Sequence, residues 1–178
     1  MNRWQCVAKR VTGECIGAEV GVAEGKMSAM LLKTMPGLTL YMIDRWSEYS
    51  DEERKRDRHS KQPLLRQRDW DDKYRKARSV VSIYGERAHL VRESSLEAVA
   101  HFDDEVFDFV FLDADHSYEG LKADIQAWLP KVKPGGYLCG HDYHNKANPK
   151  PGVDKAVDEA FGDVVKGDAN STWFVKRE

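Results

Sequence analysis

The stretch Phe107-Asp-Phe-Val-Phe-Leu112, followed at once by Asp113-Ala-Asp-His116, is the part of this sequence around which the rest is arranged. A short, nearly continuous apolar run is typical of a strand buried in a parallel sheet. In open α/β sheets, ligands bind beyond the carboxyl ends of the strands, where two acids and a histidine stand in this chain. A helix cap at Asp115 or Ser117 would explain one polar residue but does not require all of them. The stretch therefore predicts an α/β fold with a functional site after this strand.

Length and composition are those of a single globular domain. The chain has 178 residues, of which 41% are hydrophobic and 33% charged. A net charge of −2 gives no overall attraction to nucleic acid or to an anionic membrane. No apolar run approaches the roughly 20 residues that cross a bilayer, and the start of the chain lacks the apolar region of a signal peptide. We therefore expect a cytoplasmic protein that makes no membrane contact, and nucleic acid is an unfavoured partner.

Strand and helix patterns alternate along the chain, which predicts a mostly parallel sheet. Strands are expected at 16–20, 38–43, 89–91, 107–112 and 137–140. Apolar residues at helical spacing predict helices at 2–11, 27–35, 70–84, 118–132 and 153–161. Lys133-Pro-Gly-Gly136 is expected to end the fourth helix, and 163–166 with 172–175 to form an antiparallel hairpin.

Residues 45–69 interrupt this alternation. They contain the mixed-charge run Asp51-Glu-Glu-Arg-Lys-Arg-Asp-Arg58, which has no clear apolar face. A connection of this length is usually functional or irregular. We interpret it as a charged insertion or a lid that recognises an anionic or sugar substrate. A simple solvated face is the alternative, because the acids nearly balance the bases.

Acids end several of the predicted strands: Glu19, Asp44, Asp113 and Asp142. The carboxyl ends of parallel strands lie along one edge of a sheet, so these side chains are expected to converge. Taken alone, the glycines of the turn 21–25 could serve a tight connection, and Asp44 could be a loop acid. Together, a glycine turn after the first strand and an acid after the second are typical of a nucleoside-cofactor site, in which the acid accepts hydrogen bonds from ribose hydroxyls.

The turn itself, Glu19-Val-Gly-Val-Ala-Glu-Gly25, indicates which cofactor to expect. A dinucleotide site needs G-x-G-x-x-G, with backbone amides free to reach a pyrophosphate. The two acids of this turn would repel pyrophosphate but tolerate a nucleoside that carries sulfonium and ammonium charges. The spacing therefore favours S-adenosylmethionine over NAD.

Five motifs in order resemble those of class I S-adenosylmethionine-dependent methyltransferases: 19–25, 41–44, 107–119, 133–136 and 140–143. More narrowly, they are similar to the small-molecule O-methyltransferase branch that includes macrocin O-methyltransferase and cephalosporin-hydroxylase-like proteins. The resemblance implies one domain over 1–178 with a Rossmann-like seven-stranded sheet. That sheet would be mostly parallel, with a reversed C-terminal hairpin and helices on both faces.

The resemblance also assigns residues to the methionine end of the cofactor. Gly21 and Gly25 would line its methionine and ribose part, and Glu19 would hold that neighbourhood in shape. Ser28, at the start of the first helix after the turn, would meet the cofactor carboxylate together with helix N-terminal amides.

At the nucleoside end, the resemblance gives the ribose hydroxyls to Asp44. Ser94 stands where family members contact the adenine. Ser94 and Glu97 also have the spacing of a capping box, which is a purely structural explanation for the serine.

Metal-dependent relatives bind Mg²⁺ through positions that match Asp113, His141 and Asp142. Mg²⁺ prefers carboxylates and water, whereas His141 stands where relatives carry an acid. That departure weakens the case for Mg²⁺ or indicates a softer divalent cation such as Mn²⁺. Tyr143 likewise replaces an asparagine of the catechol-type enzymes. The sequence leaves metal binding open.

His116 lies three residues after Asp113, where a macrolide-sugar methyltransferase relative has its proposed general base. An imidazole titrates near neutrality and can accept a hydroxyl proton as the oxygen attacks a methyl group. A cation at Asp113 would share that task by lowering the pKa of the hydroxyl. His144 is a second candidate, and a capping or solvent-facing role is the alternative for His116.

We therefore expect a methyltransferase acting on a hydroxyl of a small sugar, polyketide-type or phenolic acceptor. The alternatives are an accessory or regulatory protein of the same fold, a nucleic-acid methyltransferase and, more distantly, an NAD enzyme. Trp4, Trp46 and Trp70 are candidates for the surface of a homodimer.

Overall fold

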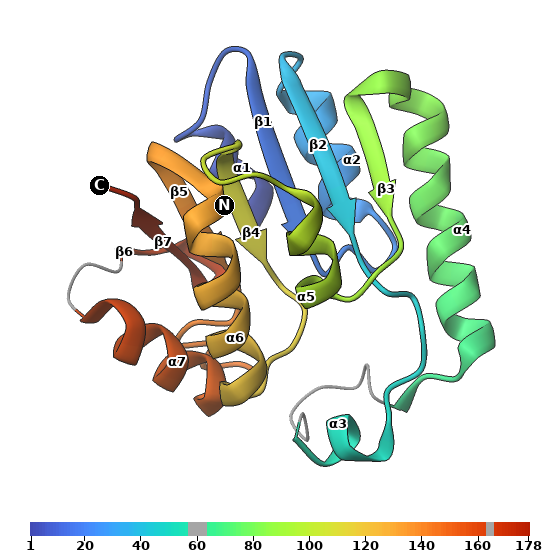
Figure 1. Cartoon of the computed structure of the whole chain (residues 1–178), viewed down its shortest axis with the longest axis vertical. Coiled ribbons are helices and arrows are strands. Elements are labelled where there is room, and N and C mark those ends of the chain that lie inside the picture. The colour runs from blue at the N-terminus through green and yellow to red at the C-terminus, as the bar shows by residue number, and fades with distance from the viewer. Residues whose placement is uncertain (57–63, 163–165) are drawn as a thin grey trace.

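The computed structural model describes the chain except for residues 57–63 and 163–165, and it contains one seven-stranded sheet (Figure 1). The strand order is β3-β2-β1-β4-β5-β7-β6. The strands are β1 (Cys15–Val20), β2 (Leu38–Ile43), β3 (Ala88–Val91), β4 (Phe107–Leu112), β5 (Val132–Gly140), β6 (Lys166–Asp168) and β7 (Thr172–Lys176). The first five run parallel, and β7 is antiparallel to both β5 and β6. The predicted Rossmann-like sheet with a reversed C-terminal hairpin is confirmed.

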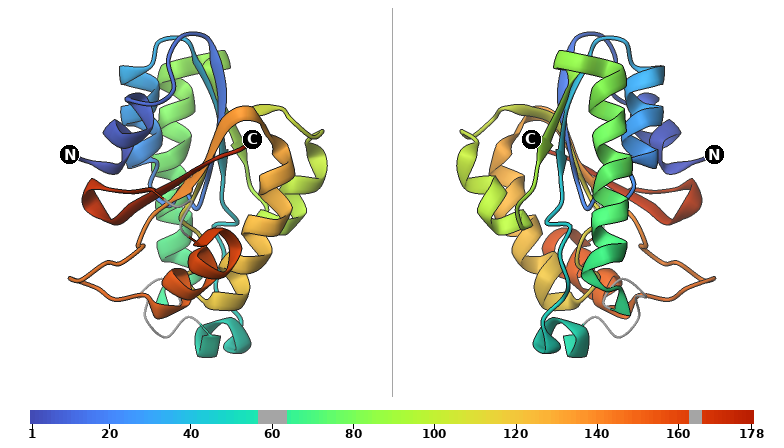
Figure 2. Two further views of the ribbon diagram at one scale, coloured as in Figure 1. Left: turned by 90° about the vertical axis from the view of Figure 1, so that its left-hand side faces the viewer. Right: turned by 90° about the vertical axis from the view of Figure 1, so that its right-hand side faces the viewer.

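Helices cover both faces of the sheet (Figure 2). Along the chain they are α1 (Arg3–Ala8), α2 (Lys26–Thr34), α3 (Asp51–Arg56), α4 (Gln67–Tyr84), α5 (Ser95–Ala98), α6 (Tyr118–Trp128) and α7 (Pro151–Phe161). Helices α1, α2 and α4 pack on one face, and α5, α6 and α7 pack on the other. Each face has its own apolar core.

Strand β4 explains why two cores form. Its side chains alternate between the faces, so that Phe111 joins the core under α1, α2 and α4 while Val110 joins the core under α5, α6 and α7. Both side chains are fully buried. Burying an aliphatic or aromatic side chain of this size contributes roughly 1.5–3 kcal/mol. Because both faces of a central strand are buried, its sequence is a nearly continuous apolar run.

The sequence-based boundaries were wrong around Lys133-Pro-Gly-Gly136. Helix α6 ends at Trp128, and β5 already begins at Val132, so this segment belongs to the strand and does not end the helix. The pairing with β4 shifts between Phe107 and Phe109, and 133–136 form the extra length of a bulge. Proline and positive-φ glycine are tolerated in a bulge, and Gly135 has φ +82°.

The first strand of the hairpin ends at Asp168, two residues after the predicted end. Strand β6 spans Lys166–Asp168, while the expected strand residues 163–165 lie outside the described part of the chain. The first helix is also shorter than expected, ending at Ala8 and not at residue 11.

Two tryptophans proposed for a dimer surface lie in the core. Trp46 is fully buried and Trp70 is 3% exposed, which makes the prediction of a surface role wrong for both. Trp4 is partly buried against the same core. Trp46 follows β2 and packs against Tyr74 of α4, and Trp70 lies on α4 itself, where it stacks with Tyr49. Within the described ranges, no helix has the length and apolar character needed to cross a membrane.

Candidate active site

A cleft of about 1100 Å³ opens at the carboxyl ends of the parallel strands. It lies where the strand order reverses, with β2 on one side of β1 and β4 on the other. The turn after β1 and the ends of β2, β4 and β5 contribute to its wall. All four predicted strand-end acids, Glu19, Asp44, Asp113 and Asp142, line it. The predicted convergence of these acids is confirmed.

Gly21 lets the turn after β1 approach the end of β4. Its φ of +95° is unfavourable for residues with a Cβ. A Cβ at this position would also lie 2.3 Å from the backbone oxygen of Asp113. The absence of a side chain therefore lets the backbone at Gly21 lie in contact with the end of β4, beside the cleft. Gly25 has φ +76° but lies behind the cleft wall, where a Cβ would meet Val80 of α4 at 3.1 Å.

Glu19 is a buried acid whose nearest support is Ser28. It is 3% exposed, and burial raises its pKa to about 8 despite the hydrogen bond from the Ser28 hydroxyl. Ser28 is fully buried and lies outside the cleft lining. The structure therefore places Ser28 as the group that orients Glu19, and not as a residue whose side chain faces a ligand.

Asp44 stands at the end of β2 with both carboxylate oxygens oriented by backbone amides. The amide of Ala23 donates to Oδ2, and the amide of Trp46 donates to Oδ1, each at 2.9 Å. Desolvation raises the pKa of this carboxyl, and the two amide hydrogen bonds act in the opposite direction. The indole of Trp46 donates to the Ala23 carbonyl at 2.8 Å, which ties the turn after β2 to the turn after β1. Asp44 thus presents a fixed acceptor pair to the cleft.

The wall between β3 and α6 carries Ser94, Ser95 and Asp124. Ser94 caps α5: its Oγ accepts from the Glu97 amide and donates to the Glu97 carboxylate at 2.6 Å, as the capping box predicted. Ser95 donates at 2.5 Å to Asp124, which is 4% exposed. Sequence reasoning missed Asp124, because on α6 it reads as an ordinary polar helix position.

At the other end of the cleft, His116 lies between two carboxylates. Its Nε2 is 3.4 Å from Asp113 Oδ1 and 3.1 Å from Asp142 Oδ2. Asp142 also accepts from Asn145 at 2.6 Å. Burial alone would raise the pKa of Asp142, but the hydrogen bonds from His116, His141 and Asn145 hold it well below its ordinary value. Of the two candidate caps of α6, Asp115 and Ser117, the structure shows Ser117, whose Oγ accepts from the Gly120 amide; the preference for Asp115 is wrong.

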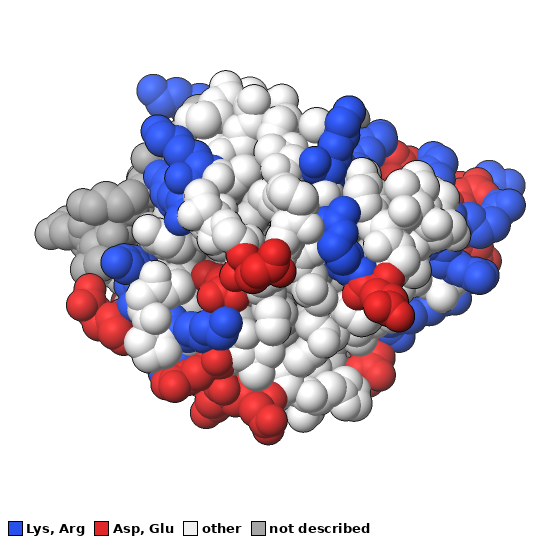
Figure 3. Space-filling view, turned by 90° about the horizontal axis from the view of Figure 1, so that it is seen from above, with Lys and Arg blue, Asp and Glu red and all other residues white. Residues whose placement is uncertain are grey.

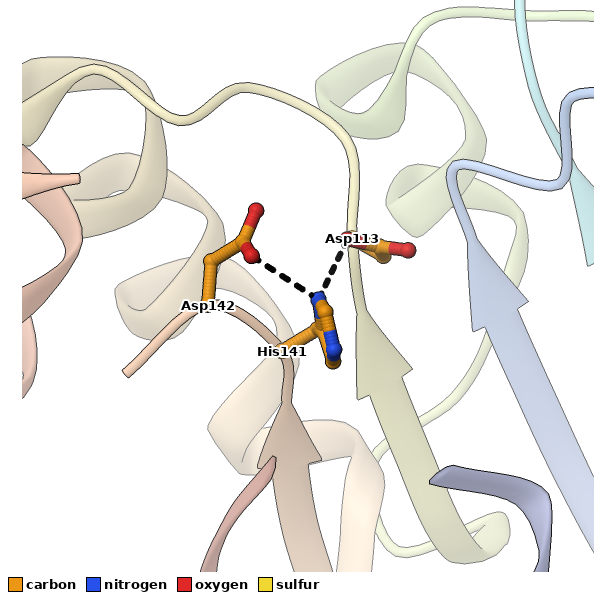
Figure 4. Close-up of side chains that lie close together, drawn as sticks. All are labelled: Asp113, His141 and Asp142. Carbon is orange, nitrogen blue, oxygen red and sulfur yellow. Dashed lines mark ion pairs between the residues drawn. The ribbon is translucent and has the colours of Figure 1, made fainter. Parts of the chain in front are cut away.

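The three residues that match the metal ligands of relatives also meet (Figure 4). One ligand atom from each of Asp113, His141 and Asp142 falls within a group no wider than 4.8 Å. His141 Nδ1 faces both acids, at 4.0 Å from Asp113 and 3.0 Å from Asp142. Two carboxylates and an imidazole fit a divalent ion that accepts nitrogen, such as Mn²⁺, better than they fit Mg²⁺.

Arg3 is a site residue with no recognisable signal in the sequence. It lies on α1, and its guanidinium donates to Asp113 Oδ2 from across the cleft. The pair joins residues 110 positions apart, so no local pattern could predict it. Arg3 neutralises one of the two acids beside His116 and competes with any cation for Asp113.

The described part of the 45–69 connection borders the cleft. Arg45 forms an ion pair with Glu53 of α3 and stacks over the ring of Tyr49 at 4.4 Å. These three side chains, with Arg56 and Leu65, line the cleft. The lid predicted for 45–69 thus has its described ends beside the site, while 57–63 lie outside the described residues.

Comparison with known proteins identifies the family. Residues 18–143, which carry every strand-end acid of the cleft, match the family model described as a methyltransferase domain. The chain belongs to this methyltransferase family. A curated relative, an uncharacterised protein of Sinorhizobium fredii, is 33% identical over 55 residues. That match spans 31% of the present chain and only 6% of the relative.

Solved methyltransferase structures share the fold at low identity. A calicheamicin methyltransferase superposes with a TM-score of 0.68 at 16% identity, covering 97% of this chain and 76% of the other. A putative caffeoyl-CoA O-methyltransferase from Staphylococcus aureus gives 0.63 at 13% identity, with coverages of 97% and 80%. An N1-methyltransferase from Burkholderia thailandensis, solved with 1,6-didemethyltoxoflavin and S-adenosylhomocysteine, gives 0.57 at 12% identity, with coverages of 98% and 76%. The shared fold therefore serves both oxygen and nitrogen acceptors.

Proposed function

We propose that this methyltransferase transfers the methyl group of S-adenosylmethionine to a hydroxyl of a small molecule. The observation that carries the proposal is the single cleft that holds, at one end, the fixed acceptor Asp44 beside the Gly21 turn and, at the other, His116 between Asp113 and Asp142. A nucleoside cofactor fits the first end and a proton acceptor serves the second. Methyl transfer needs the donor and the acceptor held in line in one site, and one cleft would hold both.

In the proposed reaction, the acceptor oxygen forms a bond to the methyl carbon while the carbon–sulfur bond breaks. S-adenosylhomocysteine leaves, and the imidazole of His116, whose Nε2 donates to Asp142, accepts the hydroxyl proton at its other ring nitrogen. The carboxylates at 3.1 and 3.4 Å then stabilise the imidazolium. Arg3 moderates their combined charge by pairing with Asp113. Glu19, held by Ser28, faces the positively charged methionine end of the cofactor.

The proposed reaction can also be assisted by a divalent cation. Asp113, His141 and Asp142 would hold it, and it would supply a Lewis acid that lowers the pKa of the acceptor hydroxyl. Arg3 would then release Asp113.

The acceptor is proposed to be small and hydroxylated, for example a sugar, polyketide-type or phenolic compound. Tyr49, Leu65 and Trp70 contribute apolar surface to the cleft, and Arg56 and Lys73 contribute positive charge. A protein of the same fold that binds the cofactor without catalysis is the second candidate. The cleft does not favour this non-catalytic candidate. A protein that only binds the cofactor would have no use for His116 between two carboxylates.

A nucleic-acid acceptor gains little support. On the face at the amino ends of the strands, basic and acidic side chains are interspersed among uncharged ones (Figure 3). This face thus shows no basic stripe of the kind that binds a phosphate backbone, and the net charge of −2 gives the chain no overall attraction to nucleic acid.

The test is cofactor binding followed by methyl transfer. Calorimetry with S-adenosylhomocysteine should give a saturable signal with one site per chain, and Asp44→Ala should weaken it at least tenfold. A panel of hydroxylated compounds is then incubated with methyl-labelled cofactor, and label transfer is compared between the wild type and His116→Asn. No binding by the wild type would refute the proposal. Binding without transfer to any acceptor would favour the non-catalytic candidate.

A further inference from the structure

Asp124 is a buried acid on the cleft wall that the proposed reaction does not use. It projects from α6 next to the Ser94–Ser95 segment and is 4% exposed. Burial raises its pKa to about 7, and the nearby Asp115 adds to the effect. Within the described part of the chain, no arginine, lysine or histidine forms an ion pair with it. An acid in this position is costly to the fold unless something donates to it.

The hydrogen bonds around Asp124 have a fixed direction. The indole Nε1 of Trp128 donates to Ser95 Oγ at 2.8 Å, and Ser95 in turn donates to Asp124 Oδ1 at 2.5 Å. Since an indole can only donate, the serine hydroxyl must accept from Trp128 and pass its own proton toward Asp124. Ser95 therefore has no proton left for a ligand. Among the described residues, Ser95 is the side chain that donates to Asp124, through Oδ1, and Asp124 itself lines the cleft.

The wall beside Asp124 is lined by small residues. Gly120 and Ala123, four residues and one residue before Asp124 on α6, both line the cleft. The side of Gly120 on which a Cβ would stand is covered by the Asp115 carboxylate, which such a Cβ would meet at 2.2 Å. Ser94, whose side chain is occupied by its capping box, lines the same region. The cleft wall beside Asp124 is thus made of small side chains, the Asp115 carboxylate and a serine whose hydroxyl is already engaged.

We propose that Asp124 reads the 6-amino group of the adenine ring, with Oδ2 accepting a hydrogen bond from that amine. This inference rests on the proposed cofactor and names a specificity residue that the motif-based assignment of Ser94 does not include. A 6-amino purine offers a donor at this edge, whereas a 6-oxo purine offers an acceptor that an ionised carboxylate repels. The Trp128–Ser95 chain then acts by fixing the rotamer of Asp124, and Ser95 is a positioning residue.

The test compares two ligands that differ at one group, S-adenosylhomocysteine and S-inosylhomocysteine. Calorimetry at pH 8.5 keeps Asp124 ionised. We expect the wild type to bind the adenosyl compound at least tenfold more tightly, since hydrogen bonds to charged groups have effects of this order. Asp124→Asn presents an amide that can donate to a 6-oxo group. It should weaken binding of the adenosyl compound about tenfold and bring the two ligands within about threefold of each other.

Ser95→Ala serves as the matched variant, because it keeps the carboxylate and removes only its support. It should lower adenosyl affinity about threefold and retain a preference for the amine. Equal affinity of the wild type for both ligands would overturn the inference without any variant. An unchanged ratio in folded Asp124→Asn would overturn it as well, while leaving the proposed function intact. If the wild type binds neither ligand, the proposed function itself fails together with this contact.

Discussion

Replacing Glu19 with glutamine should make the protein more stable at high pH. Burial raises the pKa of Glu19 from 4.5 to about 8, so the folded state holds a proton that the unfolded chain releases above about pH 4.5. The folded state then binds more protons than the unfolded state, and the free energy of unfolding falls as the pH rises through this window. The fall amounts to about 1.4 kcal/mol for each pH unit at most. We expect Glu19 to remove about 3 kcal/mol between pH 5 and pH 8.

Glu19→Gln keeps the shape of the side chain and an oxygen that can accept from Ser28. The difference in unfolding free energy between the variant and the wild type should therefore grow by about 3 kcal/mol from pH 5 to pH 8. The measurement is urea denaturation followed by tryptophan fluorescence at half-unit pH steps. Asp124 contributes a fall of the same sign, but it is present in both proteins and cancels in the difference.

The matched control is Glu24→Gln, five residues along the same turn. Hydrogen bonds from Lys26 and Lys76 lower the pKa of Glu24 to about 2. It is thus ionised in both states above pH 5, and its variant should differ from the wild type by the same amount across the range. Parallel stability curves for Glu19→Gln and the wild type would refute the argument that Glu19 is held protonated by burial.

Three further predictions concern the site. His116→Asn should slow methyl transfer by about 10²- to 10⁴-fold while leaving calorimetric affinity for S-adenosylhomocysteine within about threefold; an unchanged rate would rule out the base assignment. Gly21→Ala should destabilise the fold by roughly 1–3 kcal/mol in urea titrations and weaken cofactor binding, because the new Cβ meets the end of β4 and the backbone has positive φ; unchanged stability and affinity would contradict the close approach. Mn²⁺ should raise the melting temperature of the wild type, more strongly in Arg3→Ala because Asp113 is then released, and not in Asp142→Asn; a wild type indifferent to Mn²⁺ in both calorimetry and melting would argue against a metal site.

Much of the fold could be predicted from the sequence because its signals are local. The apolar run of β4 and the spacing of α2 and α7 each require only a few neighbouring residues, and the predicted bounds agree with the structure to within two residues. The prediction that 133–136 end a helix was wrong because a long-range interaction overrides the local signal. The Pro-Gly-Gly of this segment is a strong local stop signal, but pairing of β5 with β4 and β7 overrides it and absorbs the extra residues in a bulge.

The residues of the site also differ in whether the sequence could predict them. Strand-end acids could be predicted because topology alone brings them to one edge of the sheet. Arg3 and Asp124 could not, since each reaches the cleft from a helix face whose orientation depends on packing across the whole core. Ser28 and Gly25 were predicted to contact the cofactor, but both lie outside the cleft lining. A motif identifies which residues matter, but not which of them faces the ligand and which supports the wall behind it.

The acids of the cleft together favour a cationic ligand. Glu19, Asp44 and Asp124 all have raised pKa values, because burial deprives each carboxylate of water. In the absence of a ligand, such a cluster costs the fold stability as the pH rises. A ligand that brings ammonium and sulfonium charges to Glu19 and hydrogen-bond donors to Asp44 and Asp124 favours the ionised forms again. Its binding is then linked to proton release, so affinity increases with pH across the same range in which stability falls. The destabilising acids and the selection of a positively charged nucleoside cofactor are therefore two consequences of one arrangement.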